Sequence, residues 1–113
     1  MATTREIPRQ EWESFLQELT DTELDHSVRV ESESAQGGGK LLSGAPLIGL
    51  SLEGKGAQAD ALEITVKVGG PQGDYTHHVD RARALFSLED DQGHVQCLDI
   101  EDENDEKTLV YFD

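Results

Sequence analysis

The sequence predicts an α+β fold in which one N-terminal amphipathic helix packs on an antiparallel β-meander, a curled sheet or partly open barrel. Near the N-terminus the apolar residues recur with a helical period, and further along they alternate with polar residues. Glycine- and aspartate-rich turns then interrupt the chain at short intervals. No segment between the expected strands is long enough for a crossover helix, so a parallel sheet is disfavoured.

The helix is predicted over about residues 8–20. Its apolar residues follow the spacing i, i+3, i+4 and i+7: Trp12, Phe15, Leu16 and Leu19. Pro8 suits the first helical position, where its missing N–H costs nothing, and Thr20-Asp21-Thr22 supplies a polar break. We expect the apolar stripe to seal the sheet rather than to dock a partner, because a chain with few aromatic residues needs them in its core.

About six or seven strands are predicted over residues 26–113. The clearest is Leu62–Val68, in which four aliphatic residues share one face and polar residues share the other. The other expected strands alternate more weakly: Val28–Val30, Leu50–Leu52, Tyr75–Val79, Ala84–Leu88, Val95–Ile100 and Thr108–Phe112.

The expected turns and loops lie between these strands. They include Gly54–Gly56, Gly69–Asp74, Asp90–Gly93 and Asp102–Glu106. Ser32–Lys40 contains three consecutive glycines and is predicted to be a mobile loop.

Composition places limits on domain count, location and partners. The 113 residues indicate a single domain, 1–113, and the net charge of −15 disfavours nucleic acid and anionic membranes as partners. A lone cysteine, Cys97, the absence of a signal-like apolar run and the absence of a membrane-spanning stretch favour a small, soluble, cytoplasmic protein.

The acidic excess has two interpretations. Acidic side chains keep a protein soluble in a salt-rich cytoplasm, where salt screens their repulsion, and this halophilic interpretation is favoured because the chain has only 4 lysines. The alternative is an acidic patch for a basic partner. Like-charge crowding in Asp99–Glu106 is expected to raise the pKa of these carboxyl groups above their usual values.

No catalytic, cofactor-binding or metal-binding residue is assigned, and no cofactor is expected. His77 and His78 point to opposite faces of a strand, so they cannot chelate a metal together, and His78 with Asp80 is too few ligands. The acidic run Asp102–Glu106 is interpreted as a hairpin turn rather than a cation loop, because it lacks the glycine and the distant glutamate of a calcium loop. Cys97 lies in an apolar strand and is expected to pack as a small hydrophobic residue.

The chain resembles a family of uncharacterised prokaryotic proteins, domain of unknown function 5335, over its whole length. The resemblance is carried by Ile7–Phe15, which contains Ile-Pro-Arg-x-x-Trp-x-x-Phe, by Ile48-Gly49, by Thr76-His77, and by the closing Thr108–Phe112 strand. The first and last matches are the specific ones. The resemblance implies a compact α+β domain and no particular chemistry.

Two classes of function therefore stand side by side. The first is a non-enzymatic binding or accessory protein, with an unidentified protein partner or a second copy of the chain, paired through an edge strand or the helix. The second is an enzyme whose site is assembled from scattered residues such as Tyr75, His77 and Asp80. A deep pocket with converging polar groups would favour the enzyme, whereas a shallow groove or an open strand edge would favour the binding domain.

Overall fold

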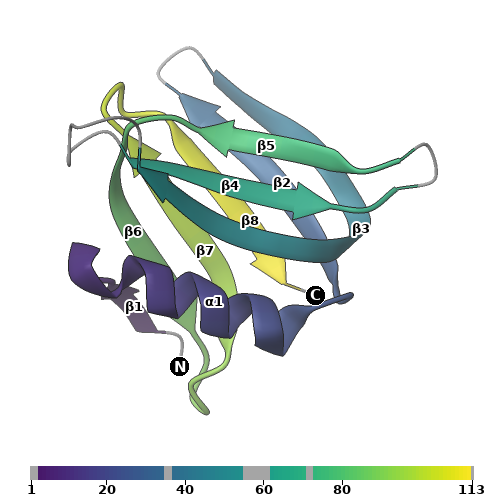
Figure 1. Ribbon diagram of the computed structural model, residues 1–113, viewed down its shortest axis with the longest axis horizontal. Coiled ribbons are helices and arrows are strands. Elements are labelled where there is room, and N and C mark those ends of the chain that lie inside the picture. The colour runs from purple at the N-terminus through teal and green to yellow at the C-terminus, as the bar shows by residue number, and fades with distance from the viewer. Residues whose placement is uncertain (1–2, 35–36, 55–61, 71–72, 113) are drawn as a thin grey trace.

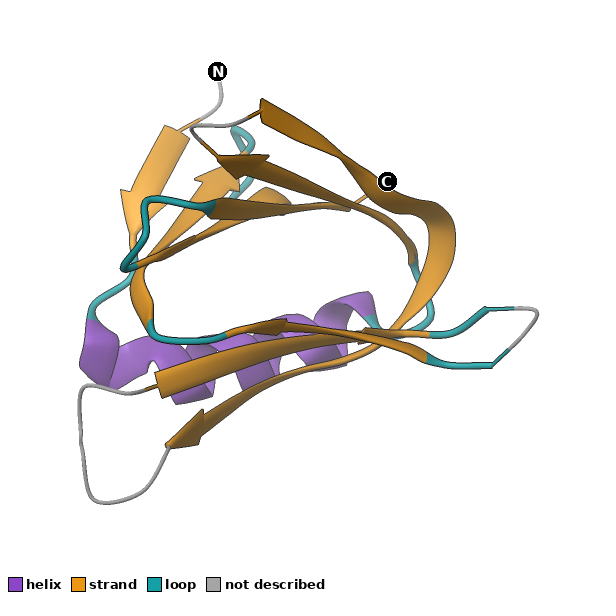
Figure 2. Ribbon diagram, turned by 90° about the horizontal axis from the view of Figure 1, so that it is seen from above, coloured by secondary structure: helices purple, strands orange, loops and turns teal. Residues whose placement is uncertain are grey.

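The computed structural model describes residues 3–34, 37–54, 62–70 and 73–112. Within these residues eight antiparallel strands form one curled sheet that does not close, and α1 lies beneath it (Figures 1 and 2). In chain order the elements are β1 (Thr3–Glu6), a 3-10 turn (Arg9–Glu11), α1 (Trp12–Glu23), β2 (Ser27–Ser34), β3 (Gly37–Gly54), β4 (Leu62–Val68), β5 (Tyr75–Val79), β6 (Ala82–Glu89), β7 (Val95–Asp102) and β8 (Lys107–Phe112).

The predicted single meander is wrong in its connectivity. The strands lie in the order β1-β6-β7-β8-β2-β3-β4-β5, so β2–β5 and β6–β8 are two separate meanders. The pairing of β8 with β2 joins them, for example Phe112 opposite Val28. The chain passes from one meander to the other at a tight turn containing Arg81, whose φ is 54°. Strand count also exceeds the expected six or seven, because β1 was not predicted.

Strand β1 left no signal in the sequence because all four of its residues are exposed and none alternates with an apolar neighbour. It is held in place by pairing with β6, with Glu6 opposite Phe86 and Thr3 opposite Glu89. Arg5 adds an ion pair to Glu89 at 3.1 Å. The pairing therefore depends on a strand about 80 residues away in the chain.

Helix α1 begins later and ends later than predicted. Pro8 precedes the 3-10 turn in an extended conformation, with ψ of 144°, instead of occupying the first helical position. The helix then continues through the expected polar break to Glu23. Trp12, Leu16 and Leu19 are buried as expected, while Phe15 is only partly buried under the Arg5 guanidinium, 5.7 Å from its ring centroid.

The glycine tract is a strand, which corrects the predicted mobile loop. Gly37–Gly39 pairs with Ser32–Ser34, so the parts of Ser32–Lys40 that are described form a hairpin ladder. Glycine is needed at position 38, because a Cβ there would lie 2.5 Å from the Ser32 carbonyl oxygen. Close approach of the two backbones therefore favours glycine at position 38 of the tract, while a Cβ at Gly39 would meet nothing within 4 Å.

Strand β3 changes partner along its length. Its first part pairs with β2 up to Pro46, and its second part pairs with β4 from Leu47 onward. Gly44, with φ of 70°, is the extra residue at a register shift in the pairing of β3 with β2, between Val28 and Arg29. Such a β-bulge bends the strand. The bend lets a single strand contribute to both sides of the curl.

The edge of β3 that β2 leaves uncovered is covered by the end of α1. The Leu50 N–H donates to Thr20 Oγ1 at 2.9 Å, and the Leu47 N–H donates to the His26 carbonyl at 2.9 Å. Helix and sheet are therefore joined by hydrogen bonds as well as by apolar packing. This contact explains why the helix extends past the polar residues that were expected to end it.

The core lies between the inner face of the sheet and α1. Its most completely buried side chains come from both meanders and from the helix: Trp12, Leu16, Val28, Val30, Leu47, Ile64, Leu85, Leu98, Ile100 and Val110. The Trp12 indole N–H donates to the Ile7 carbonyl at 2.8 Å, so its one polar group is satisfied inside the core. Among the described residues, no helix has the length and apolar character that crossing a membrane requires.

Candidate functional site

The expected candidate residues lie on or beside β5, the last strand of the sheet. Tyr75, His77 and Val79 stand opposite Val68, Val66 and Ile64 of β4, which are buried. Cross-strand partners share a face, so these three side chains face the interior of the curl. His78 points the other way, its side chain 55% exposed. The prediction that the two histidines lie on opposite faces is confirmed.

His77 connects β5 to the opposite meander. Its Nε2 lies 3.1 Å from Thr108 Oγ1 on β8, and Thr108 is buried. Burial lowers the pKa of His77 from its usual value, and the charge of His78 lowers it further. The imidazole is therefore neutral at pH 7 and acts as a polar bridge across the curl.

A polar pocket of about 260 Å³ opens beside this bridge, between the end of β5 and the turn that joins β7 to β8. His77 and Asp80 both line it, together with Thr108. Tyr75 does not line it and is 44% exposed elsewhere on β5. The structure thus brings together two of the three residues named for an enzyme.

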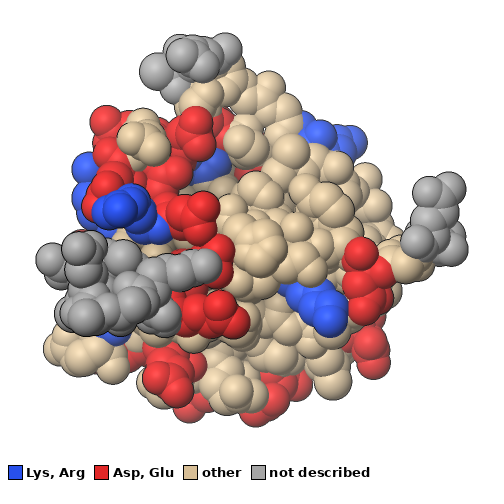
Figure 3. Space-filling model, turned by 45° about the horizontal axis from the view of Figure 1, so that its top comes forward, with Lys and Arg blue, Asp and Glu red and all other residues tan. Residues whose placement is uncertain are grey.

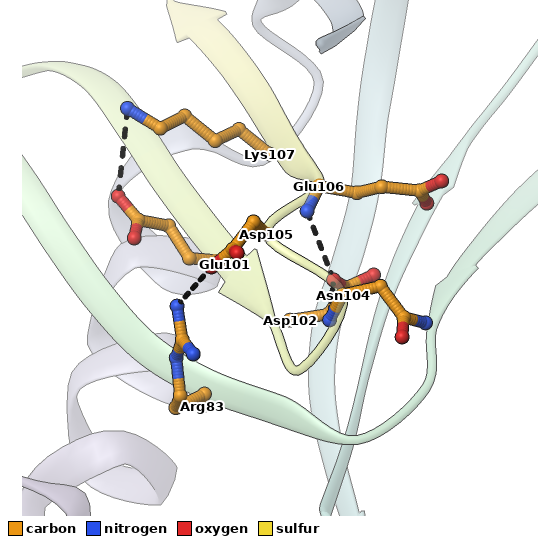
Figure 4. A network of polar contacts seen from close by, with 7 residues as sticks. All are labelled: Arg83, Glu101, Asp102, Asn104, Asp105, Glu106 and Lys107. Atoms are coloured by element: carbon orange, nitrogen blue, oxygen red, sulfur yellow. Dashed lines mark hydrogen bonds and ion pairs between the residues drawn. The ribbon is translucent and has the colours of Figure 1, made fainter. Parts of the chain in front are cut away.

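The β7–β8 turn supplies the opposite wall of this pocket with Asp102, Asn104 and Glu106. The Asn104 and Glu106 N–H groups donate to Asp102 Oδ1 at 2.8 and 3.0 Å, and Asp105 adopts a φ of 62° (Figure 4). Two cations brace the same turn (Figure 4): Arg83 contacts Asp105 at 2.7 Å and Lys107 contacts Glu101 at 3.7 Å.

The β6–β7 turn is built in the same way. Asp90 Oδ1 accepts the Gln92 and His94 N–H groups, both at 2.9 Å, and these bonds lower the pKa of Asp90. An aspartate at this place is therefore a means of closing a hairpin, which supports the interpretation of Asp102–Glu106 as a turn. In the described ranges, no group of three or more His, Cys, Asp or Glu side chains is arranged to hold a metal.

A second pocket lies on the outer face of the sheet and was not predicted. It has a volume of about 220 Å³ and is lined by Thr4, Phe86, Leu88, Cys97, Asp99, Leu109 and Tyr111. Burial raises the pKa of the Asp99 carboxyl to about 6, and the charge of Glu101 adds to this. Burial also raises the pKa of the Cys97 thiol to about 11, so Cys97 packs as a small hydrophobic residue, as expected.

The sequence did contain a sign of this pocket, because apolar and polar residues alternate only weakly in the strands that line it. Ala84–Leu88 and Thr108–Phe112 carry apolar residues at consecutive positions, so both faces of these strands are apolar. One face is needed for the core. The other face, with Phe86 and Tyr111, remains partly exposed on the outside of the sheet.

A family model described as a family of unknown function, DUF5335, matches residues 3–113. The chain belongs to the DUF5335 family. No curated protein and no solved structure was found to match it. The DUF5335 match includes β1, both pockets and every segment on which the resemblance rested. Because the DUF5335 description names no activity, function has to be argued from the geometry of the two pockets and the strand edges.

Proposed function

We propose that this DUF5335 chain is a non-enzymatic binding domain that captures an extended, basic segment of a partner protein along the edge of β5. The observation that carries the proposal is the open outer edge of β5, which pairs with β4 on one side and with no described strand on the other. An open edge presents unpaired backbone N–H and C=O groups to which a partner strand can add.

The other exposed edges are protected, whereas no described strand covers this one. The β1 edge is only four residues long and carries Arg5 and Glu6. The edge of β3 beyond Pro46 is occupied by Thr20 and His26. Strand β5 reads Tyr-Thr-His-His-Val and contains no proline, acidic residue, lysine or arginine. It therefore lacks the devices by which edge strands normally avoid pairing.

The charge next to this edge selects a basic partner. Asp80, Asp102 and Glu106 line the polar pocket, and Arg81, which also lines it, is near Glu103 at 3.8 Å. Figure 3 shows acidic side chains gathered on the side where Figure 1 places the β7–β8 turn, with Lys and Arg side chains among them. Alternate side chains of an added strand would face this pocket, where carboxylates favour lysine or arginine.

The neutral state of His77 fits this occupant. A protonated imidazole inside the pocket would repel a lysine or arginine side chain, whereas a neutral one adds no charge. Burial already keeps His77 neutral at pH 7. The pocket therefore keeps its negative character at the pH of most cells.

The enzyme alternative draws on the contact between His77 and Thr108, because an imidazole beside a hydroxyl is one arrangement that activates a nucleophile. Two observations favour binding over this alternative. Thr108 is only 6% exposed, which shields its hydroxyl from a substrate, and Tyr75 lies outside the pocket. Thr108→Val removes the hydroxyl and should leave peptide binding unchanged under the binding proposal.

The proposal is tested by NMR titration of the ¹⁵N-labelled chain with a short peptide of alternating lysine and threonine. We expect amide shifts in β5, in Asp80 and in the β7–β8 turn, and new protection of β5 amides from hydrogen exchange. Asp80→Asn with Glu106→Gln should weaken binding, and Glu18→Gln, an exposed helix change on the other part of the molecule, should not.

Two control peptides separate strand addition from simple charge attraction. A peptide of the same length with glutamate in place of lysine should not bind. A lysine peptide with N-methyl groups on alternate backbone nitrogens keeps its charge but cannot form a ladder, so it should bind much more weakly. Equal binding of the N-methylated peptide would show that β5 does not pair with it, and the proposal would be wrong.

A further inference from the structure

The outer-face pocket lies where two rows of side chains cross the sheet. One row runs through Phe86, Asp99 and Leu109, which stand opposite one another on β6, β7 and β8. The adjacent row runs through Leu88, Cys97 and Tyr111 on the same three strands. Asp99 is therefore a carboxyl group with apolar side chains beside it on both neighbouring strands and in the next row.

One oxygen of this carboxyl has no partner. Asp99 Oδ1 is buried and accepts no hydrogen bond within the part of the chain that is described. A buried, unpaired acceptor is costly, and more so when it belongs to an ionised group. Such a group is normally satisfied by a donor, and no described residue donates to Oδ1. The side-chain hydrogen bond between Asp99 and Glu101 is available only while a proton is shared between the two carboxyl groups.

Two cations of the same sheet face are engaged elsewhere. Lys107 is near Glu101 at 3.7 Å. Arg29 contacts Glu31 at 2.8 Å and lies over the Tyr111 ring, 4.2 Å from its centroid. Neither supplies the missing donor to Oδ1. The outer face therefore combines an apolar hollow with one carboxylate that lacks a counter-ion in contact.

We propose that this pocket binds small primary amines that carry an aromatic or branched apolar group. The ammonium pairs with the Asp99 carboxylate, and the apolar group lies against Phe86, Leu109 and Tyr111. A volume of about 220 Å³ suits a ligand of this size, and most of the lining is apolar, with Asp99 as the one charged side chain that fixes orientation. Anions are repelled by the charge of Asp99, which lines the pocket.

This site is independent of the β5 edge, so it goes beyond the proposed function. The two surfaces share no lining residue. The strand-addition peptide should leave the amides of Phe86, Asp99 and Leu109 unshifted, and a small amine should leave those of β5 unshifted. Failure of either proposal is therefore visible without affecting the test of the other.

Phenethylamine is the probe for this site, and its neutral and anionic counterparts, phenethyl alcohol and phenylacetate, are the controls. Titrations followed by NMR should show saturable shifts at Asp99, Phe86 and Tyr111 with the amine, weaker shifts with the alcohol and none with the anion. A hydrogen bond between two charged groups is stronger than one with a neutral donor, so the amine should bind about tenfold or more tightly than the alcohol.

Matched variants on one strand locate the interaction. Asp99→Asn keeps the shape of the side chain and should reduce amine binding to the level of the alcohol. Glu101→Gln removes the neighbouring carboxylate, which faces Lys107 and does not line the pocket, and should keep the preference for the amine over the alcohol. Amine affinity should also fall as the pH drops through about 6, where Asp99 takes up a proton.

Three results would overturn the proposal. They are absence of saturable binding by phenethylamine, equal affinity for the amine and the alcohol, and retention of the amine preference in the Asp99→Asn variant. A loss of affinity in Glu101→Gln with no loss in Asp99→Asn would move the contact to the other carboxylate and would also reject Asp99 as the acceptor.

Discussion

Two aspartates on the β6–β7 hairpin show how position decides the chemistry of one residue type. Asp90 accepts backbone N–H groups in its turn, and these bonds lower its pKa. Asp99 lies among apolar side chains, and burial raises its pKa to about 6. Crowding by like charge was the expected cause of raised pKa values in this segment. For Asp99 the charge of Glu101 does contribute, but burial is the larger cause.

The raised pKa of Asp99 predicts a pH-dependent contribution to stability. Because the folded state holds the Asp99 proton more tightly than the unfolded state, this contribution is complete below the usual aspartate pKa of 3.8 and is lost as the pH rises from there through about 6. The lowered pKa of His77 acts in the opposite direction. The stability that neutral His77 contributes to the fold is lost as the pH falls below the pKa that this histidine has in the unfolded chain. The quantity to measure is therefore the difference between the wild-type chain and Asp99→Asn.

Urea unfolding at pH 5 and at pH 7.5 gives this difference. Relative to the wild type, Asp99→Asn should be more stable at pH 7.5, and that advantage should be smaller at pH 5. Asp90→Asn is the control. The pKa of Asp90 is lowered, so its contribution to stability changes only at pH values below the usual carboxyl pKa and is the same at pH 5 and pH 7.5. An Asp99→Asn difference that is the same at both pH values would contradict the burial of a charged carboxyl.

At the level of elements, β3 does most to shape the sheet. It pairs with β2, bends at Gly44, then pairs with β4, while the end of α1 binds its remaining edge. Each of these contacts joins segments that are separate in the sequence. The local patterns predicted the helix stripe and the Leu50–Leu52 strand, but they could not indicate that the glycine tract belongs to the same strand.

The adjacent glycines of this tract offer a matched pair. Gly38→Ala should destabilise the fold by about 1–3 kcal/mol, because its Cβ would lie 2.5 Å from the Ser32 carbonyl oxygen. Gly39→Ala meets nothing within 4 Å and should be neutral, or stabilising by about 0.4–1 kcal/mol through a less flexible unfolded chain. Thermal unfolding of both variants measures this contrast. Equal effects would mean that the β2–β3 hairpin does not pair in this register.

For the whole molecule, the dominant property is the net charge of −15. Most of its ion pairs join partly exposed side chains, such as Arg83 with Asp105, and exposed pairs contribute little. The carboxylates are therefore in excess, and the folded state concentrates repulsion that the unfolded chain relaxes. Under the proposed function, the same excess favours a basic segment over a second copy of the acidic chain at the open edge of β5.

Added salt should raise the melting temperature. The Debye length falls from about 10 Å at 0.1 M to about 3 Å at 1 M, so repulsion between surface carboxylates is screened. Sodium chloride and potassium chloride should act alike, and millimolar calcium should give no additional saturable gain, because Asp102 Oδ1 already accepts two backbone N–H groups. A melting temperature that is indifferent to salt would reject the solubility interpretation of the acidic surface and leave a basic partner as its explanation.

The sequence by itself determined the α+β class, the helix stripe, the clearest strand and the aspartate turns, because periodicity and turn chemistry act over a few residues. The tertiary structure decided the place of β1, the pairing of β2 with β8 and the surroundings of Asp99. Val28 and Phe112 lie opposite each other although 84 residues separate them, and such contacts leave no local pattern. Asp99 acquired its unpaired oxygen only when β6 and β8 placed apolar side chains on both sides of it.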